Sequence, residues 1–295
     1  MLKPRKEEAI KAAISLTPEY TKLFRELQKG GGRITFLPEI AQMQNVHGAY
    51  VKLYDNELKL GVALMVALLG EAEFKQLQTE LKEASIEEQQ KYIDEITTEE
   101  VINQFSEMLT IPENQQEWDD ARKQFNSLPE DERLELSKRG AHYWAYFFGS
   151  FFNTLSVMVH GEKLTALVPK AISGDDKAFS KAVQIDRMLL LHHPYFIERK
   201  SRAQDEGDTD FIRALANRES TPILNGRIQF PGLYMLFGIL ESFQWLDSLG
   251  ATEVLSLCDQ AKLDRFQNRI DDADYVRQRL KEYRLWQKTQ RLSRI

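Results

Sequence analysis

The most strongly apolar stretch of the chain runs from Gly140 to Gly161 and has no charged residue across its 22 positions. Within it, large side chains recur at helical spacing, which is typical of a helix with a broad apolar face. We therefore predict one long helix, or two joined near Gly140, from Pro129 to His160, with residues 143–159 buried. The large side chains recur every four residues, at Tyr143, Phe147, Phe151, Leu155 and Val159.

A membrane-spanning helix is the alternative interpretation of this stretch, because its length is sufficient to cross a bilayer. Its polar side chains argue against that alternative, since His142, Asn153 and Thr154 would each cost free energy in hydrocarbon unless paired. The sequence favours a buried central helix, and no stable insertion into a membrane is expected.

Two further apolar segments, residues 60–69 and 233–246, are predicted to be core helices beside the central one. The rest of the chain alternates amphipathic segments with helix-start and helix-stop residues. A helix at 7–14 and a second one beginning at Thr17 and ending at Gly30 are expected, as is a helix over 177–191. The expected fold class is all-α, a multi-helix globular bundle with three strongly apolar core helices.

Two Gly-Asp turns, at Gly174 and Gly207, lie 33 residues apart, and each precedes an apolar helical pattern. This period suits helical-hairpin repeats, which stack on one another to bury a common core. A repeat-like C-terminal half is therefore an alternative within the all-α class, although repeat arrays usually have three or more copies.

The length of 295 residues allows one large domain or two ordinary ones. We expect an N-terminal helical region at 1–160, which includes an acidic middle third, and a C-terminal helical region at 161–295. No linker-like composition separates them, so one continuous domain is the alternative.

Composition narrows the class of protein further. With 42% hydrophobic and 28% charged residues the balance is that of a soluble globular protein. A single cysteine, Cys258, excludes an internal disulfide and fits a reducing compartment. The first residues carry positive charge without an apolar core of signal-peptide length. A cytoplasmic location is expected.

The net charge of −6 is unevenly distributed along the chain. Residues 71–135 include 19 acidic and 6 basic side chains, whereas residues 275–295 include 7 basic and 1 acidic. Charge asymmetry of this kind marks an interaction surface, or two parts of one protein that attract each other.

The C-terminal helix, expected over residues 273–291, has the most suggestive pattern of the sequence. Its cations are spaced by four and three residues and share an arc of roughly 80°, and an apolar arc that contains Tyr283 and Trp286 adjoins them. The stripe could contact phosphates of a nucleic acid or an acidic protein partner. It could also pair with the chain's own acidic third, or be solvated. The stripe consists of Arg277, Lys281, Arg284, Lys288 and Arg291.

The sequence contains no familiar catalytic motif. The sequence has no HExxH, GxSxG or GxGxxG motif, and its adjacent His192 and His193 would point in different directions on a helix. Cys258 lies among leucines, which favours a core position. The sequence therefore predicts no cofactor and no metal site, and it favours a non-enzymatic protein.

Three function classes remain open. The first is a helical binding or scaffold protein that contacts a protein or nucleic acid through the C-terminal basic helix. The second is a binder of a flat apolar ligand that uses the aromatic helix at 141–159. The third is an enzyme whose site is assembled only in space. The residues expected to line the ligand pocket are His142, Tyr143, Trp144, Phe147 and Phe151.

Overall fold

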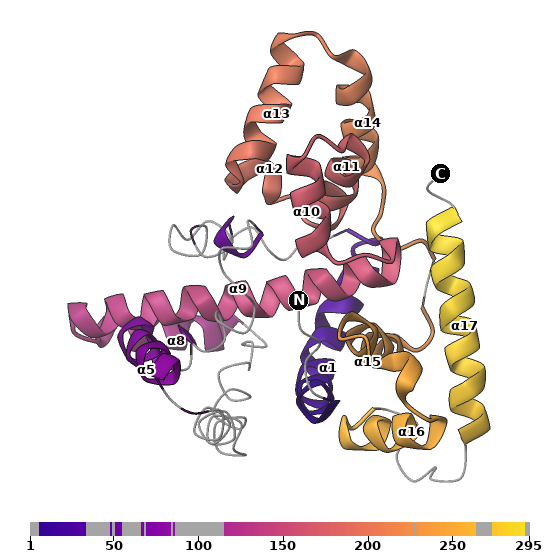
Figure 1. Ribbon diagram of the computed structural model, residues 1–295, viewed down its shortest axis with the longest axis horizontal. Coiled ribbons are helices and arrows are strands. Elements are labelled where there is room, and N and C mark those ends of the chain that lie inside the picture. The colour runs from indigo at the N-terminus through magenta and orange to yellow at the C-terminus, as the bar shows by residue number, and fades with distance from the viewer. Residues whose placement is uncertain are drawn as a thin grey trace. The chain divides into compact units, whose positions relative to one another are not determined.

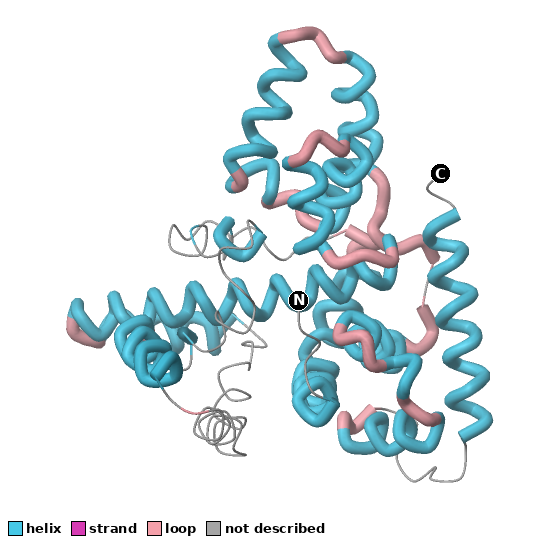
Figure 2. The backbone as a smooth tube through the Cα atoms, in the orientation of Figure 1, coloured by secondary structure: helices cyan, strands magenta, loops and turns pink. Residues whose placement is uncertain are grey.

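The computed structural model describes residues 6–33, 48, 51–54, 66–67, 69–83, 85, 115–226, 228–263 and 273–292. Within these ranges every regular element is a helix (Figure 2), which confirms the prediction of an all-α, multi-helix globular fold. Most of the core helix expected at 60–69 lies outside the described residues. None of the described helices is long and apolar enough to cross a membrane.

The helices are labelled in Figure 1. They are α1 (Lys6–Lys29), α5 (Glu71–Glu83), α8 (Gln115–Ser127), α9 (Glu130–His160), α10 (Leu164–Ile172), α11 (Asp176–Ile185), α12 (Leu189–His192), α13 (Pro194–Asp205), α14 (Thr209–Ser220), α15 (Pro231–Ser242), the 3-10 helix η1 (Leu246–Ser248), α16 (Ala251–Gln260) and α17 (Ala273–Leu292).

The described residues fall into two compact units. Unit 1 contains α1, Tyr54 and everything described from Gly149 onward. Unit 2 contains α5, α8 and α9 as far as Phe148. The helix predicted from Pro129 to His160 is confirmed as the single unbroken helix α9. The division expected near Gly161 stays a prediction.

The core of unit 1 forms where α1 and α15 meet the second half of α9. Phe151 of α9 lies edge to face with Tyr20 of α1, with 5.2 Å between ring centroids, and both rings are fully buried. A Cβ on Gly238 of α15 would lie 2.5 Å from the sulfur of Met158 in α9. The missing side chain at Gly238 therefore allows α15 to approach α9 closely.

Helix α1 corrects the expectation of two helices divided at Thr17. The Thr17 hydroxyl does not cap a new helix; it donates a hydrogen bond back to the carbonyl of Ala13. Pro18 is exposed inside one continuous helix. A proline in a helix interior costs about 3 kcal/mol, but an unbroken buried stripe crosses this position and packs on α15. The stripe contains Ala9, Ala13, Leu16, Tyr20, Phe24 and Leu27.

Two helical hairpins, α10–α11 and α13–α14, pack on each other within unit 1. In each, a glycine with positive φ ends the first helix, and the next residue caps the second: Asp175 accepts from the amides of Lys177 and Ala178, and Asp208 accepts from that of Phe211. The hairpins have the same turn chemistry at the predicted 33-residue spacing. Membership of a longer repeat array stays a prediction.

Two predicted helices end earlier than expected. The helix expected over 177–191 stops at Ile185, because Asp186 has an extended backbone and its carboxylate accepts hydrogen bonds from the Tyr54 hydroxyl (2.9 Å) and the Met188 amide (3.0 Å). The helix expected over 233–246 stops at Ser242, and Gln244 adopts a positive φ of 63°.

In unit 2, the first part of α9 packs beside the residues around Gly70. Arg139 donates a hydrogen bond to the carbonyl of Ala67 (3.0 Å), and the Glu135 side chain lies over Gly70. Aromatic rings of α9 between positions 143 and 148 are in mutual contact. In contrast, nearly every described side chain of α8 after Asp119 is exposed.

Candidate interaction site on the C-terminal helix

The inner face of α17 is buried against α15. The Tyr283 ring is fully buried and makes edge contacts with Tyr234 and Phe237 of α15, at centroid distances of 5.2 and 5.3 Å. Trp286, one turn along, lies 5.5 Å from the Tyr234 ring. Aromatic pairs of this kind stabilise packing beyond their buried area, so α17 is held by its inner face as part of the core of unit 1.

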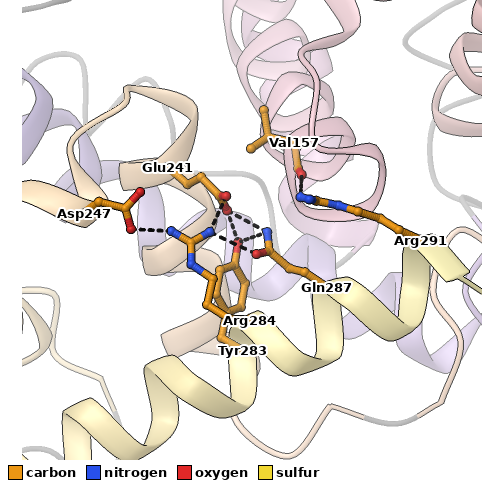
Figure 3. A network of polar contacts seen from close by, with 7 residues as sticks. All are labelled: Val157, Glu241, Asp247, Tyr283, Arg284, Gln287 and Arg291. Carbon is orange, nitrogen blue, oxygen red and sulfur yellow. Dashed lines mark hydrogen bonds and ion pairs between the residues drawn. The ribbon is translucent and has the colours of Figure 1, made fainter.

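A polar network at the middle of α17 fixes the helix further, and Glu241 of α15 is its centre (Figure 3). The Glu241 carboxylate accepts hydrogen bonds from the Tyr283 hydroxyl (2.7 Å), the Gln287 amide (2.7 Å) and the Arg284 guanidinium. Arg284 also donates to Asp247 (2.6 Å). Charge-assisted hydrogen bonds are the strong ones, so Arg284 is directed inward and docks α17.

The network changes the ionisation of two members. Burial raises the pKa of Tyr283 well above its ordinary value, and the neighbouring Glu241 charge acts in the same direction. Burial disfavours the charged form of Arg284, but the carboxylates of Glu241 and Asp247 outweigh that effect and raise its pKa. At neutral pH the network therefore contains a neutral phenol and a charged guanidinium.

The C-terminal end of α17 is anchored by two more contacts. The Gln290 side chain both donates to the carbonyl of Asn225 and accepts from its amide, at 2.9 and 3.0 Å. Arg291 donates to the Val157 carbonyl at the end of α9 (3.4 Å, Figure 3), and its guanidinium covers Gly161. A Cβ on Gly161 would lie 2.8 Å from that guanidinium, so the glycine makes room for Arg291.

The outward face of α17 is left with a different set of residues. Lys281 and Lys288 are exposed and have no hydrogen bond or ion pair with any other described residue. Leu285 lies between them and is 65% exposed. Arg277 is also exposed, and its ion pair within the described residues is with Asp274 on the preceding turn. We refer to Lys281, Leu285 and Lys288 as the basic outer face.

The structure thus divides the seven residues that the sequence singled out on this helix. Arg277, Lys281 and Lys288 face outward, whereas Arg284 and Arg291 contact α15 and the end of α9, respectively. Tyr283 is buried, and Trp286 is half-buried on Tyr234.

The sequence reasoning missed Leu285 as an exposed apolar residue and Glu241 as the partner of the stripe. Helix geometry did contain a signal. At about 100° per residue, Arg284 and Arg291 lie at the edge of the stripe next to the buried arc, and Lys281 lies at the opposite edge. Glu241, which closes an apolar helix, had no comparable signal, because its partners come from 40 residues or more along the chain.

The aromatic residues of the alternative ligand pocket are divided between the two units. In unit 2, the Tyr143 and Trp144 rings are 5.1 Å apart and Trp144 and Phe147 are 5.9 Å apart. His142 lies on the same helix with its Nδ1 2.9 Å from the Lys138 carbonyl. Phe151 belongs to unit 1, where it packs on Tyr20. The rings of Tyr143, Trp144 and Phe147 pack on one another, and Phe151 packs on Tyr20.

Candidate catalytic groups are few in the described ranges, where no cluster of three or more His, Cys, Asp or Glu side chains could hold a metal ion. The Cys258 thiol is buried, and burial raises its pKa to about 12. Because the thiolate is the nucleophilic form, this raised pKa disfavours Cys258 as a nucleophile at neutral pH. Comparison of the chain with protein-family models, curated proteins and solved structures gave no match.

Proposed function

We propose that this chain is a non-enzymatic helical scaffold protein that binds an acidic helix of a protein partner through the basic outer face of α17. The observation that carries the proposal is Leu285, an apolar side chain 65% exposed between two lysines on a helix whose other face is firmly docked. An interface needs an apolar contact at its centre and complementary charge around it.

A protein partner suits this face better than a nucleic acid does. Affinity for nucleic acid grows with the number of phosphates neutralised, and only three cations of the stripe do not donate to α15 or to the end of α9. One of the three, Arg277, already pairs with Asp274. The apolar Leu285 side chain can make no hydrogen bond or ion pair with a phosphate backbone. The net charge of −6 also opposes the approach of a polyanion.

The geometry also defines the partner's chemistry. Lys281 and Lys288 are seven residues apart, which places them about two turns or roughly 10 Å from each other along the helix. A complementary helix would present an apolar residue with carboxylates one turn away. An amphipathic acidic helix meets that description.

The proposal is tested with a fluorescent synthetic helix of about three heptads, with leucines along one seam and glutamates beside them. We expect binding by fluorescence anisotropy that weakens with salt, since exposed charges are screened. The double variant Lys281→Glu/Lys288→Glu should weaken binding at least about tenfold, and Leu285→Asn should weaken it with little change in salt dependence.

A matched control reverses two exposed lysines elsewhere, Lys11 and Lys177, and changes the net charge equally. This control should bind the peptide like the unaltered protein. Preferential binding of duplex DNA over the peptide would instead favour the nucleic-acid alternative, and equal affinity of both double variants for the peptide would show that the outer face of α17 is not the site.

A further inference from the structure

A second surface of the chain, in unit 2, has the complementary character. Leu134 in the first turns of α9 is 53% exposed. Glu130 and Asp131, one turn earlier on the same side of the helix, are also exposed. Lys138, one turn later, is half-buried. We refer to Glu130, Asp131 and Leu134 as the acidic outer face.

This surface is uncommon within the described part of the chain. Among its exposed large apolar side chains, Leu134 is the one that has two carboxylates on the neighbouring turn of its own helix. Leu285 is the one that has a lysine on the turn before it and another on the turn after it. Monomeric proteins expose single apolar side chains routinely. Leu134 and Leu285 differ from such isolated residues because carboxylates adjoin the first and lysines adjoin the second, so the two surfaces are complementary in charge.

We infer that the occupant of the acidic outer face is the basic outer face of a second copy of this chain, so that the protein associates with itself. The inference rests on the proposed function and names the partner helix: the first turns of α9. Leu285 of one copy would pack on Leu134 of another, and a lysine beside Leu285 would pair with Glu130 or Asp131.

Charge pattern favours this occupant over a copy of the same surface. Two basic outer faces would bring four lysines together, and two acidic outer faces would bring four carboxylates together, both of which are repulsive. The contact is therefore between unlike surfaces, and each chain offers one of each. A chain with both surfaces can associate in a pair that uses the contact twice, or in a longer series.

The experiment uses two variants of the full chain with opposite defects. In the first, Lys281→Glu/Lys288→Glu makes the basic face acidic; in the second, Glu130→Lys/Asp131→Lys makes the acidic face basic. Sedimentation velocity over a concentration series should show self-association of the unaltered protein. Each variant alone should associate at least about tenfold more weakly, because both of its surfaces now have the same sign.

The decisive sample is an equimolar mixture of the two variants. The first variant keeps its acidic face and the second keeps its basic face, so the mixture should form a one-to-one complex at concentrations where each variant alone is monomeric. If the basic and acidic outer faces instead paired within one chain, the mixture would form no complex. Each double variant would then melt at a lower temperature than the unaltered protein, and a chain with all four reversals would recover that melting temperature while staying monomeric. That result would overturn the inference.

Controls separate this result from misfolding and from the proposed function. Acidic residues in a first helical turn also stabilise the helix, so circular dichroism checks each variant, and Leu134→Asn provides a disruption without a charge change. The Lys11→Glu/Lys177→Glu variant should associate normally. A protein that stays monomeric at all concentrations, yet binds the synthetic acidic helix, would disprove self-association and leave the proposed function intact.

Discussion

At the scale of single residues, the most consequential side chain on the C-terminal helix's docking surface is Glu241. It accepts hydrogen bonds from three α17 side chains and is itself largely shielded from solvent. A buried carboxylate is unfavourable unless it is paired. Here three donors compensate for the lost solvation, and they fix the rotation of α17 so that Lys281 and Lys288 face outward.

Replacing Glu241 with alanine should therefore destabilise the protein by about 2–3 kcal/mol, because the fully buried Tyr283 hydroxyl loses its acceptor and Arg284 loses one of its two carboxylate partners. The free energy of unfolding from urea titration measures this. Asp210→Ala is the matched control, since Asp210 pairs with Arg213 in full solvent exposure; that substitution should change stability by less than about 0.5 kcal/mol. Equal effects of both substitutions on the free energy of unfolding would show that the Glu241 network does not stabilise the docking of α17.

Cys258 gives a prediction about pH at the same scale. Its pKa in the folded protein, about 12, lies above the ordinary value of 9.0. The unfolded chain therefore loses this proton first, and stability is complete below pH 9 and declines as the pH rises from there toward 12. Between these pH values the free energy of unfolding falls with a slope that approaches about 1.4 kcal/mol per pH unit. Urea titrations on both sides of pH 9 should show a steeper decline for the unaltered protein than for Cys258→Ala. Parallel curves would contradict the assignment.

At the scale of elements, the sequence predicted those helices whose buried stripe is continuous and whose ends have caps. α9 and α17 are examples, because both have long runs at helical spacing. Predicted helix boundaries were wrong where the boundary depends on contacts with residues far away in the sequence. Thr17 resembles a cap, but burial of the surrounding stripe against α15 keeps α1 intact. Asp186 ends α11 through Tyr54, which is 132 positions away, and no local pattern contains that information.

Two glycines in helices have opposite predicted effects. Gly238→Ala would place its Cβ 2.5 Å from the Met158 sulfur and 3.0 Å from the Thr154 methyl group, so we expect destabilisation of about 1–2 kcal/mol after the gain in helix propensity. Gly140→Ala in α9 meets nothing within 4 Å and should stabilise by about 0.5–1 kcal/mol. Thermal melting of the two variants distinguishes a close helix contact from simple propensity, since propensity alone would raise both melting temperatures.

At the scale of the whole molecule, the sequence predicted the all-α class and contained the basic stripe of the last helix, because both depend on local composition and spacing. It could not reveal which cations of the stripe face outward. That division depends on which face of α17 packs on α15 and on the position of Glu241, both of which are set by contacts between distant segments. Leu285 became a candidate only when the buried face was known.

The pairing of α1 with α15 has a consequence for synthesis of the protein. Gln28 at the end of α1 donates a hydrogen bond to the carbonyl of Ile228, 200 positions later in the chain. A ribosome adds about 5–20 residues per second, so the apolar stripe of α1 waits roughly 10–40 seconds for its partner to emerge. Throughout that interval the apolar stripe of α1 lacks the α15 surface on which it packs in the folded protein.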